Sequence, residues 1–191
     1  MASDDAALAR LLASYAEPAR HYHTRQHLAE CLGLVDELAH LAARPGEMAV
    51  ALWYHDAVYV PLAHDNEARS AAWAGAALRA AGADDAVIAR VEKHIMATTH
   101  HDAAGDGDAR MVVDIDLAIL GASPRRFAEY ERQVRAEYAA VPSAEYRQKR
   151  RAVLARFLAR PTLYATPALR DRLERRARLN LQKAIRQTSP Q

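Results

Sequence analysis

A histidine and an aspartate stand side by side at His55 and Asp56, inside an otherwise apolar segment that runs from Trp53 to Tyr59. The aromatic and aliphatic neighbours on both sides indicate that this segment packs in a core. Burying two ionisable side chains costs free energy unless a partner compensates for it. A metal ion, a proton partner or a water network would do so, and a metal ion would satisfy both side chains at once.

Other side chains of metal-binding types occur on either side of this pair in the sequence. Thr24 is a typical helix N-cap, which places His27 inside the first helical turn and His23 just outside it. Asp114 and Asp116 interrupt a later apolar run. A strand would bury both carboxylates on one face, whereas a helix would turn them about 200° apart, so that only one faces a buried site.

The candidates are His27, the His55–Asp56 pair and one of the two later aspartates, each on a different predicted helix. Imidazole and carboxylate ligands suit zinc, manganese, iron, nickel, cobalt or magnesium, and the lack of a thiolate set argues against a purely structural zinc site. Four protein ligands leave open positions on an octahedral ion. Water at such a position loses its proton near neutral pH, which is hydrolytic chemistry.

The segments that carry these residues have the periodicity and the end signals of helices. We predict an all-α fold of about seven or eight helices, without repeats or low-complexity linkers. The predicted helices run over residues 4–14, from Thr24 to Leu41, from about Glu47 to Val60, from the Asp65 cap to Ala80 and from Asp84 past Met96, and three more begin at Ser123, Ser143 and Thr166.

Length and composition favour one globular domain over residues 1–191. Hydrophobic residues make up 51% and charged residues 26% of the chain, and Ala, Leu and Arg outnumber the β-branched residues that strands favour. No apolar run approaches the roughly 20 residues that cross a bilayer, so we expect no membrane partner. The acidic start and the single cysteine, Cys31, favour the cytoplasm and exclude an internal disulfide.

The net charge of +2 hides a strong asymmetry along the chain. Residues 1–122 carry 9 Lys and Arg against 18 Asp and Glu, whereas residues 123–191 carry 17 against 6. A basic segment of this size can meet nucleic acid or an acidic partner. Because glutamates are interspersed over three amphipathic helices, we expect these arginines to face solvent or the acidic half, without a nucleic-acid groove.

Five ordered motifs together resemble a known family. They are YHTRQH (22–27), HDAVY (55–59), DNEARSA (65–71), ATTHH (97–101) and DIDLAILG (114–121). On an all-α chain, this order of a lone His, a His-Asp pair, further His residues and a final Asp resembles the HD-domain superfamily of metal-dependent phosphohydrolases. The resemblance covers residues 15–160, and it implies a metal-site core at about 15–122 followed by basic helices at 123–191.

By this resemblance one divalent ion (Mn, Mg, Co, Ni, Fe or Zn) would bind His27, His55, Asp56 and Asp116, with Asp116 favoured over Asp114. The expected activity is hydrolysis of a nucleotide or other small phosphate ester by a metal-activated water. Candidates to hold the phosphate charge are Arg20, Arg25 and Lys93. Candidates to position the water or to protonate the leaving oxygen are Glu67 and His101.

Two alternatives belong to other functional classes. An HD-type di-iron oxygenase would need additional ligands such as His94, His100 or His101. A non-catalytic nucleotide-binding or nucleic-acid-binding module would use the basic helices instead. An iron-dependent visible absorption band would favour the first alternative, and salt-sensitive RNA binding without turnover would favour the second.

Overall fold

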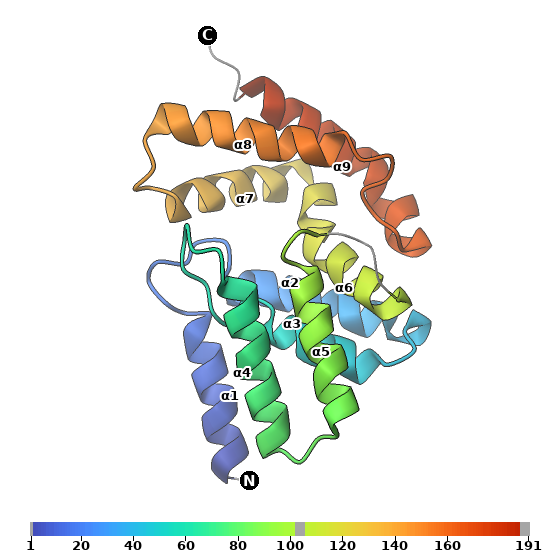
Figure 1. The fold of residues 1–191 in the computed structure, drawn as a ribbon. Coiled ribbons are helices and arrows are strands. Elements are labelled where there is room, and N and C mark those ends of the chain that lie inside the picture. Colours follow the sequence, from blue (N-terminus) through green and yellow to red (C-terminus); the bar gives the residue numbers. More distant parts are fainter. Residues whose placement is uncertain (1, 102–105, 188–191) are drawn as a thin grey trace. The chain divides into compact units, whose positions relative to one another are not determined.

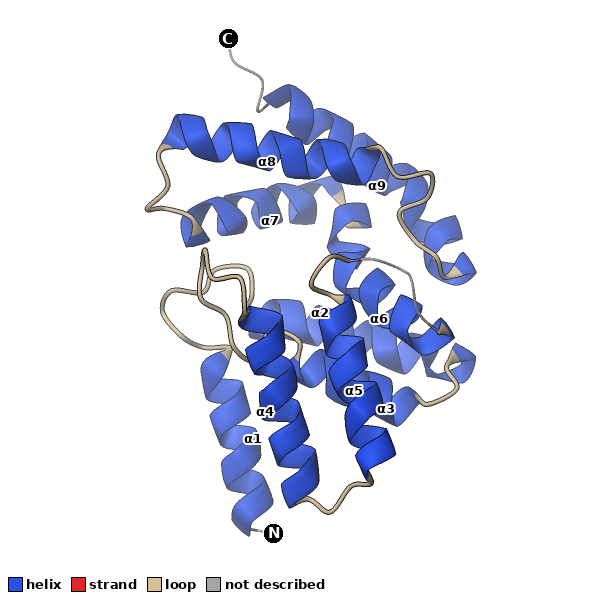
Figure 2. Cartoon of the chain, viewed as in Figure 1, coloured by secondary structure: helices blue, strands red, loops and turns tan. Residues whose placement is uncertain are grey.

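The computed structural model describes residues 2–101 and 106–187, and every regular element within these ranges is helical (Figures 1 and 2). The predicted all-α fold is therefore confirmed, with slightly more helices than the seven or eight expected. The elements are α1 (Ala2–Ser14), α2 (Arg25–Leu38), η1 (Ala39–Leu41), α3 (Pro45–Tyr54), α4 (Asn66–Ala80), α5 (Asp85–Ala97), α6 (Gly107–Asp116), η2 (Leu117–Gly121), α7 (Pro124–Glu137), α8 (Ser143–Leu158) and α9 (Pro167–Gln187), where η marks a 3-10 helix.

The chain divides into two compact units, Met1–Asp116 and Leu117–Gln191. In the first unit, α3 is the central helix, because it packs against α2, α4, α5 and α6. Its side chains Met48, Ala51 and Leu52 are fully buried. Helices α4 and α5 run side by side (Figure 1) and form the most extensive helix pair of this unit. The residues that follow α3 therefore continue from a helix that packs on four others.

Several helix starts follow the predicted signals. The hydroxyl of Thr24 accepts a hydrogen bond from the amide of Gln26, as an N-cap does. Ser123 caps α7 in the same way, and Pro167 opens α9. The start of α3 has a partner that the sequence does not reveal, because the buried carboxylate of Asp108 accepts the two amides that precede Pro45, at 2.7 and 2.9 Å.

The predicted helix from Glu47 to Val60 is wrong at its C-terminal end, because α3 stops at Tyr54. The backbone groups beyond it bond to side chains instead of continuing the helical ladder. Arg20 donates to the carbonyls of Asp56 and Ala57, at 2.5 and 3.0 Å. Ser70 and Asn66 accept the amides of residues 58 and 60, each at 3.0 Å. These long-range contacts end the helix just before the His-Asp pair.

In the second unit, α7 and α9 both pack on η2, and α8 packs on α9. Side chains of this unit form hydrogen bonds with the carbonyl groups of η2. Tyr164 donates to the carbonyl of Leu117 at 3.1 Å, and Asn180 donates to the carbonyl of Leu120 at 2.9 Å. At Gly121 an added Cβ would lie 2.6 Å from the Cβ of Leu173. Only glycine permits this close packing of η2 on α9.

Candidate metal centre

His55 is the first residue after α3, and its ring is held in one tautomer. The Nδ1 atom lies 2.7 Å from the carbonyl oxygen of Leu52, which can only accept a hydrogen bond, so Nδ1 carries a proton. In neutral His55 this leaves Nε2 with a free lone pair. The side chain is 2% exposed, and its Nε2 lies 3.0 Å from Oδ2 of Asp56 and 3.1 Å from Nε2 of His27.

His27 is oriented in a similar manner from the first turn of α2. Its Nδ1 lies 3.0 Å from the hydroxyl of the buried residue Tyr22, and its Nε2 turns toward His55. Metal-bound histidines in proteins generally use the second ring nitrogen in this way, because the outer hydrogen bond fixes the tautomer and the ring plane. The Leu52 carbonyl thus leaves the Nε2 lone pair of neutral His55 free, and a hydrogen bond donated by Nδ1 of His27 to the Tyr22 hydroxyl would do the same for His27.

Asp116, the last residue of α6, completes the group. Its Oδ1 lies 3.2 Å from Nε2 of His27 and 3.6 Å from Nε2 of His55, and Oδ2 of Asp56 lies 3.5 Å from Nε2 of His27. The structure thus brings together His27, His55, Asp56 and Asp116, from α2, the end of α3 and the end of α6. Asp114, two residues earlier on α6, is also buried.

The spacing of these atoms fits one divalent ion. Neighbouring ligands of an ion with bonds of about 2.1 Å lie roughly 3.0 Å apart in octahedral geometry and roughly 3.4 Å apart in tetrahedral geometry. The measured separations of 3.0 to 3.6 Å span that interval. Two imidazole nitrogens and two carboxylate oxygens form a donor set that suits Mn, Fe, Co, Ni or Zn, and less closely Mg.

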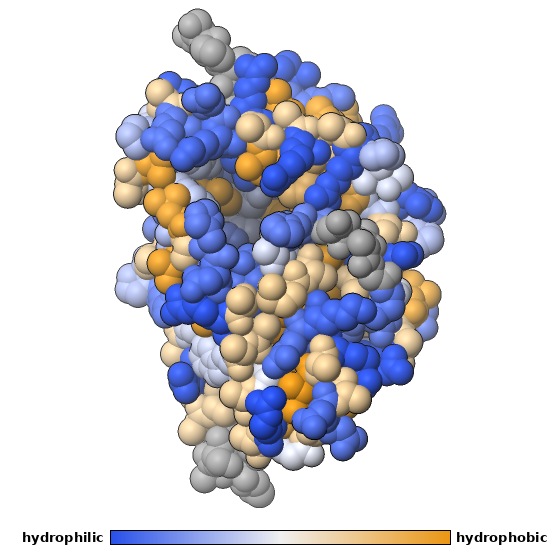
Figure 3. All heavy atoms as spheres, viewed as in Figure 1, coloured by the Kyte–Doolittle hydropathy of each residue, from blue (hydrophilic) through white to orange (hydrophobic). Residues whose placement is uncertain are grey.

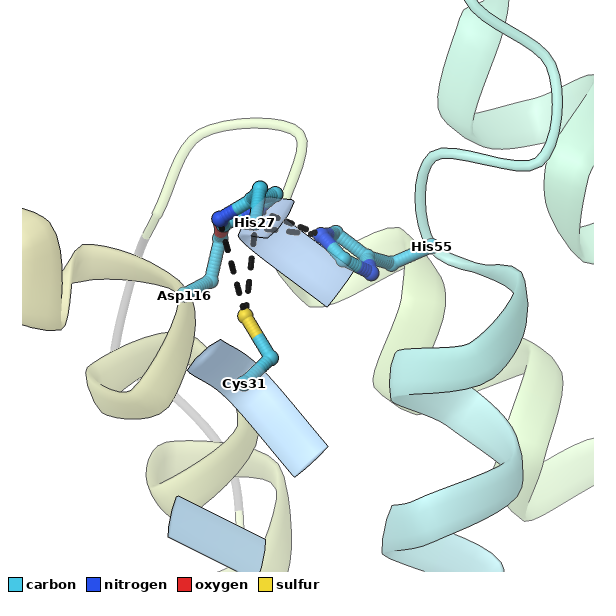
Figure 4. Close-up of side chains that lie close together, drawn as sticks. All are labelled: His27, Cys31, His55 and Asp116. Atoms are coloured by element: carbon cyan, nitrogen blue, oxygen red, sulfur yellow. Dashed lines mark hydrogen bonds and ion pairs between the residues drawn. The ribbon is translucent and has the colours of Figure 1, made fainter. Parts of the chain in front are cut away.

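Cys31 belongs to the same cluster and was not expected as a ligand. Ligand atoms of His27, Cys31, His55 and Asp116 all lie within 4.8 Å of one another, so this buried group could hold a metal ion (Figure 4). However, Sγ lies 3.7 Å from Nδ1 and 3.8 Å from Nε2 of His27. Nearly equal distances to both nitrogens place the sulfur beside the ring, away from the direction of the Nε2 lone pair. Oδ2 of Asp56 lies closer to both Nε2 atoms, at 3.0 and 3.5 Å.

The electrostatics of the cluster favour a cation. Burial alone would raise the pKa of Asp116, but hydrogen bonds from His101, His27 and His55 hold that pKa well below its usual range. The pKa of Asp56 is lowered in the same way, mainly by the neighbouring charge of His55. Burial would lower the pKa of His55, but Asp56 and Asp116 outweigh it and raise that pKa well above its usual value. The two carboxylates thus draw positive charge, a proton or a metal ion, into the site.

Comparisons of the chain with protein families, with characterised proteins and with solved structures find no match. The case for a function rests on the motifs and on this geometry. Among the described helices none is long and apolar enough to cross a membrane. On the face drawn in Figure 3, hydrophilic side chains are interspersed with small apolar patches.

The other predicted site residues lie in different settings. His101 reaches the cluster, with its Nε2 3.0 Å from Oδ2 of Asp116, and it adopts a left-handed backbone conformation (φ 48°) that non-glycine residues rarely take. Glu67 lies in the first turn of α4, half-buried, and makes no hydrogen bond or ion pair with the described residues of the cluster. Arg25 donates to the carbonyl of Leu12. Lys93, 59% exposed, faces Asp106 at 3.5 Å.

Arg20 has a role that sequence reasoning missed. It is 5% exposed, and its guanidinium donates to Glu17 and to the carbonyls of His23, Asp56 and Ala57. These bonds hold the backbone of Asp56 and its neighbours in place. The assignment of Arg20 to phosphate binding stays a prediction, but its contacts make it a positioning residue. In the sequence, only its position just before the YHTRQH motif indicated that Arg20 lies near the site.

Proposed function

We propose that this chain is a metal-dependent phosphohydrolase of the HD type that acts on a nucleotide or another small phosphate ester. One observation carries the proposal: the Nε2 atoms of His27 and His55 lie 3.1 Å apart, and each lies 3.0 to 3.6 Å from a carboxylate oxygen of Asp56 and from one of Asp116. A divalent ion bound by these atoms would polarise a phosphoryl oxygen and supply hydroxide near neutral pH.

The protein contributes orientation and charge. Tyr22 and the Leu52 carbonyl hold the two imidazoles, and Arg20 fixes the backbone at Asp56. His101, whose side chain is 32% exposed, reaches from Asp116 toward solvent. It is therefore better placed than Glu67 to orient a water or to protonate a leaving oxygen. Arg25 and Lys93 remain candidates for binding the substrate phosphate.

The di-iron alternative receives less support from the positions of its extra ligands. His94 is buried, and its Nε2 lies 3.7 Å from Asp106. His100 is exposed on the surface. Of the three histidines proposed for a second iron, His101 bonds to Asp116 of the four-ligand group. The geometry supports a centre built around one ion.

The test is a screen of nucleotides and simple phosphate esters with Mn, Mg, Co, Ni, Fe and Zn added separately. We expect metal-dependent release of phosphate or pyrophosphate, and its loss in His55→Ala together with most of the bound metal. His40→Ala, which removes an exposed histidine, is the matched control. Equal metal content in wild type and His55→Ala, measured by elemental analysis, would disprove the site.

Cys31→Ala separates the two possible ligand sets. Because the sulfur lies beside the His27 ring, this variant should keep its metal and its turnover, with a modest loss of stability from the buried site. Loss of metal in Cys31→Ala, with metal retained in Asp56→Asn, would replace Asp56 by Cys31 in the ligand set.

A further inference from the structure

Helices α7 and α9 of the second unit line a shared groove with a volume of about 430 Å³. Each helix contributes one stripe of side chains at spacings of three and four residues, which is the repeat of a single helix face. Pockets of roughly 300 to 1,000 Å³ are typical of small-molecule sites. The groove therefore has the size of a ligand site and lies wholly within one compact unit.

The floor of the groove is apolar and fixed. Phe127 and Ala184, one from each helix, are 5% and 3% exposed. Asn180 donates to the carbonyls of Leu120 and Ala122 at 2.9 and 3.0 Å, and it thereby ties α9 to the segment that leads into α7. These contacts fix the position of α9 relative to the start of α7, so the groove is a built feature of the unit.

The charged side chains along the groove leave an excess of positive charge. Its one acid, Glu131, forms an ion pair with Arg150. Arg135 donates to the carbonyls of Tyr138 and Val141 and lies over the ring of Tyr146, and none of these partners carries a negative charge.

Two further cations line the same groove. Arg132 and Lys183 make no hydrogen bond or ion pair with any residue that the structure describes. Together with Arg135, they give the groove three cations that no described acid balances. Such a set attracts an anion, and an arginine fork suits the planar or tetrahedral oxygens of carboxylate, sulfonate or phosphate.

We propose that this groove binds a small organic anion, in which a phosphate, sulfonate or carboxylate group is attached to an apolar body. The anionic group would lie between Arg132 and Lys183, and the apolar body would cover Phe127 and Ala184. This site is separate from the metal centre, and it does not depend on the proposed hydrolase activity.

Naphthalene-1-sulfonate is a suitable probe, because it has both parts and contains no phosphate ester. Sulfate and 1-naphthol each supply one part alone. We expect the sulfonate to bind the full-length protein more tightly than either, with amide chemical-shift changes at Phe127 and Ala184 in NMR spectra. Arg132→Gln/Lys183→Gln should raise its Kd by about tenfold or more, since charged hydrogen bonds are lost.

The matched control is Arg151→Gln/Arg156→Gln, which removes two exposed cations of α8 that do not line the groove. It should leave the Kd unchanged, and circular dichroism should show both double variants folded. An equal rise of the Kd in the two double variants would mean that net charge alone causes the weakening, and it would overturn the proposal. Shift changes confined to His27 and His55, or tighter binding of 1-naphthol, would overturn it as well.

Discussion

Each of the two site histidines uses one ring nitrogen on a neighbour and turns the other toward the ligand cluster. The pairing of Nδ1 of His27 with Tyr22, and of Nδ1 of His55 with Leu52, sets the direction of each lone pair. The residue types and their order made His27 and His55 visible in the sequence. The partners that orient them were not visible, because a tyrosine hydroxyl and a backbone carbonyl carry no motif.

Tyr22→Phe should weaken metal binding without abolishing it. Loss of the hydroxyl removes the hydrogen-bond partner of Nδ1 on His27, and such outer partners are worth about 10 to 100-fold in affinity. Calorimetric titration with Mn²⁺ or Zn²⁺ measures the change. Tyr138→Phe, in the second unit, is the control and should titrate as wild type does. Unchanged affinity in Tyr22→Phe would remove the tyrosine from the site.

The two aspartates of α6 should differ sharply. Oδ1 of Asp116 lies near both imidazoles and Oδ2 bonds to His101, so Asp116→Asn should lose the metal and any turnover. Asp114→Asn keeps all four ligands. It should lower metal affinity at most, so that measurable activity remains and added metal partly restores the rest. A metal titration of the two variants in parallel tests the ranking, and the reverse order would move the ligand to Asp114.

At the scale of elements, most helices follow from periodicity and capping, and the exceptions occur where tertiary contacts compete. The end of α3 at Tyr54 is the clearest case. Arg20, Asn66 and Ser70 bind the backbone that would otherwise extend the helix toward Val60. The sequence shows each of these side chains but not which carbonyl or amide it reaches. The His-Asp pair therefore stands on a turn instead of on a helix.

The ion pair between Glu47 of α3 and Arg90 of α5 should give a pH-dependent stability. Two hydrogen bonds of 2.6 and 2.7 Å from Arg90 lower the pKa of Glu47, although burial opposes the change. A carboxyl with a lowered folded-state pKa stabilises the fold fully above its unfolded pKa of about 4.3. This contribution is lost as the pH falls through the lower folded value.

Glu47→Gln should accordingly cost about 1 kcal/mol of the free energy of unfolding at pH 7. The difference from wild type should shrink on acidification below about pH 4, because the wild-type carboxyl then becomes neutral too. Urea unfolding at several pH values measures both quantities. Glu145→Gln, which breaks the exposed pair with Lys149, should have little effect. A difference that stays constant across this range would contradict the assignment.

At the scale of the molecule, the charge asymmetry coincides with the structural division. No charged residue lies between positions 117 and 122, so the acidic part of the sequence is the first unit and the basic part is the second. Several arginines of the second unit bind its own carbonyls and glutamates, as Arg135, Arg150 and Arg178 do. Composition predicted the asymmetry, but it could not show which arginines are already occupied within their own unit.

All four proposed ligands belong to the first unit, so metal binding should stabilise that unit selectively. At a free metal concentration 100 times Kd, linkage predicts a gain of about 2.7 kcal/mol in its free energy of unfolding. Native-state hydrogen exchange should show slower exchange of the most protected amides in α2, α3 and α6 on addition of metal. His55→Ala should show no such change, which separates site binding from nonspecific metal effects.

The helices of the second unit provide an internal control. Amides of α7, α8 and α9 should exchange at the same rate with and without metal. Equal added protection in those three helices would mean that the two units unfold as one cooperative body.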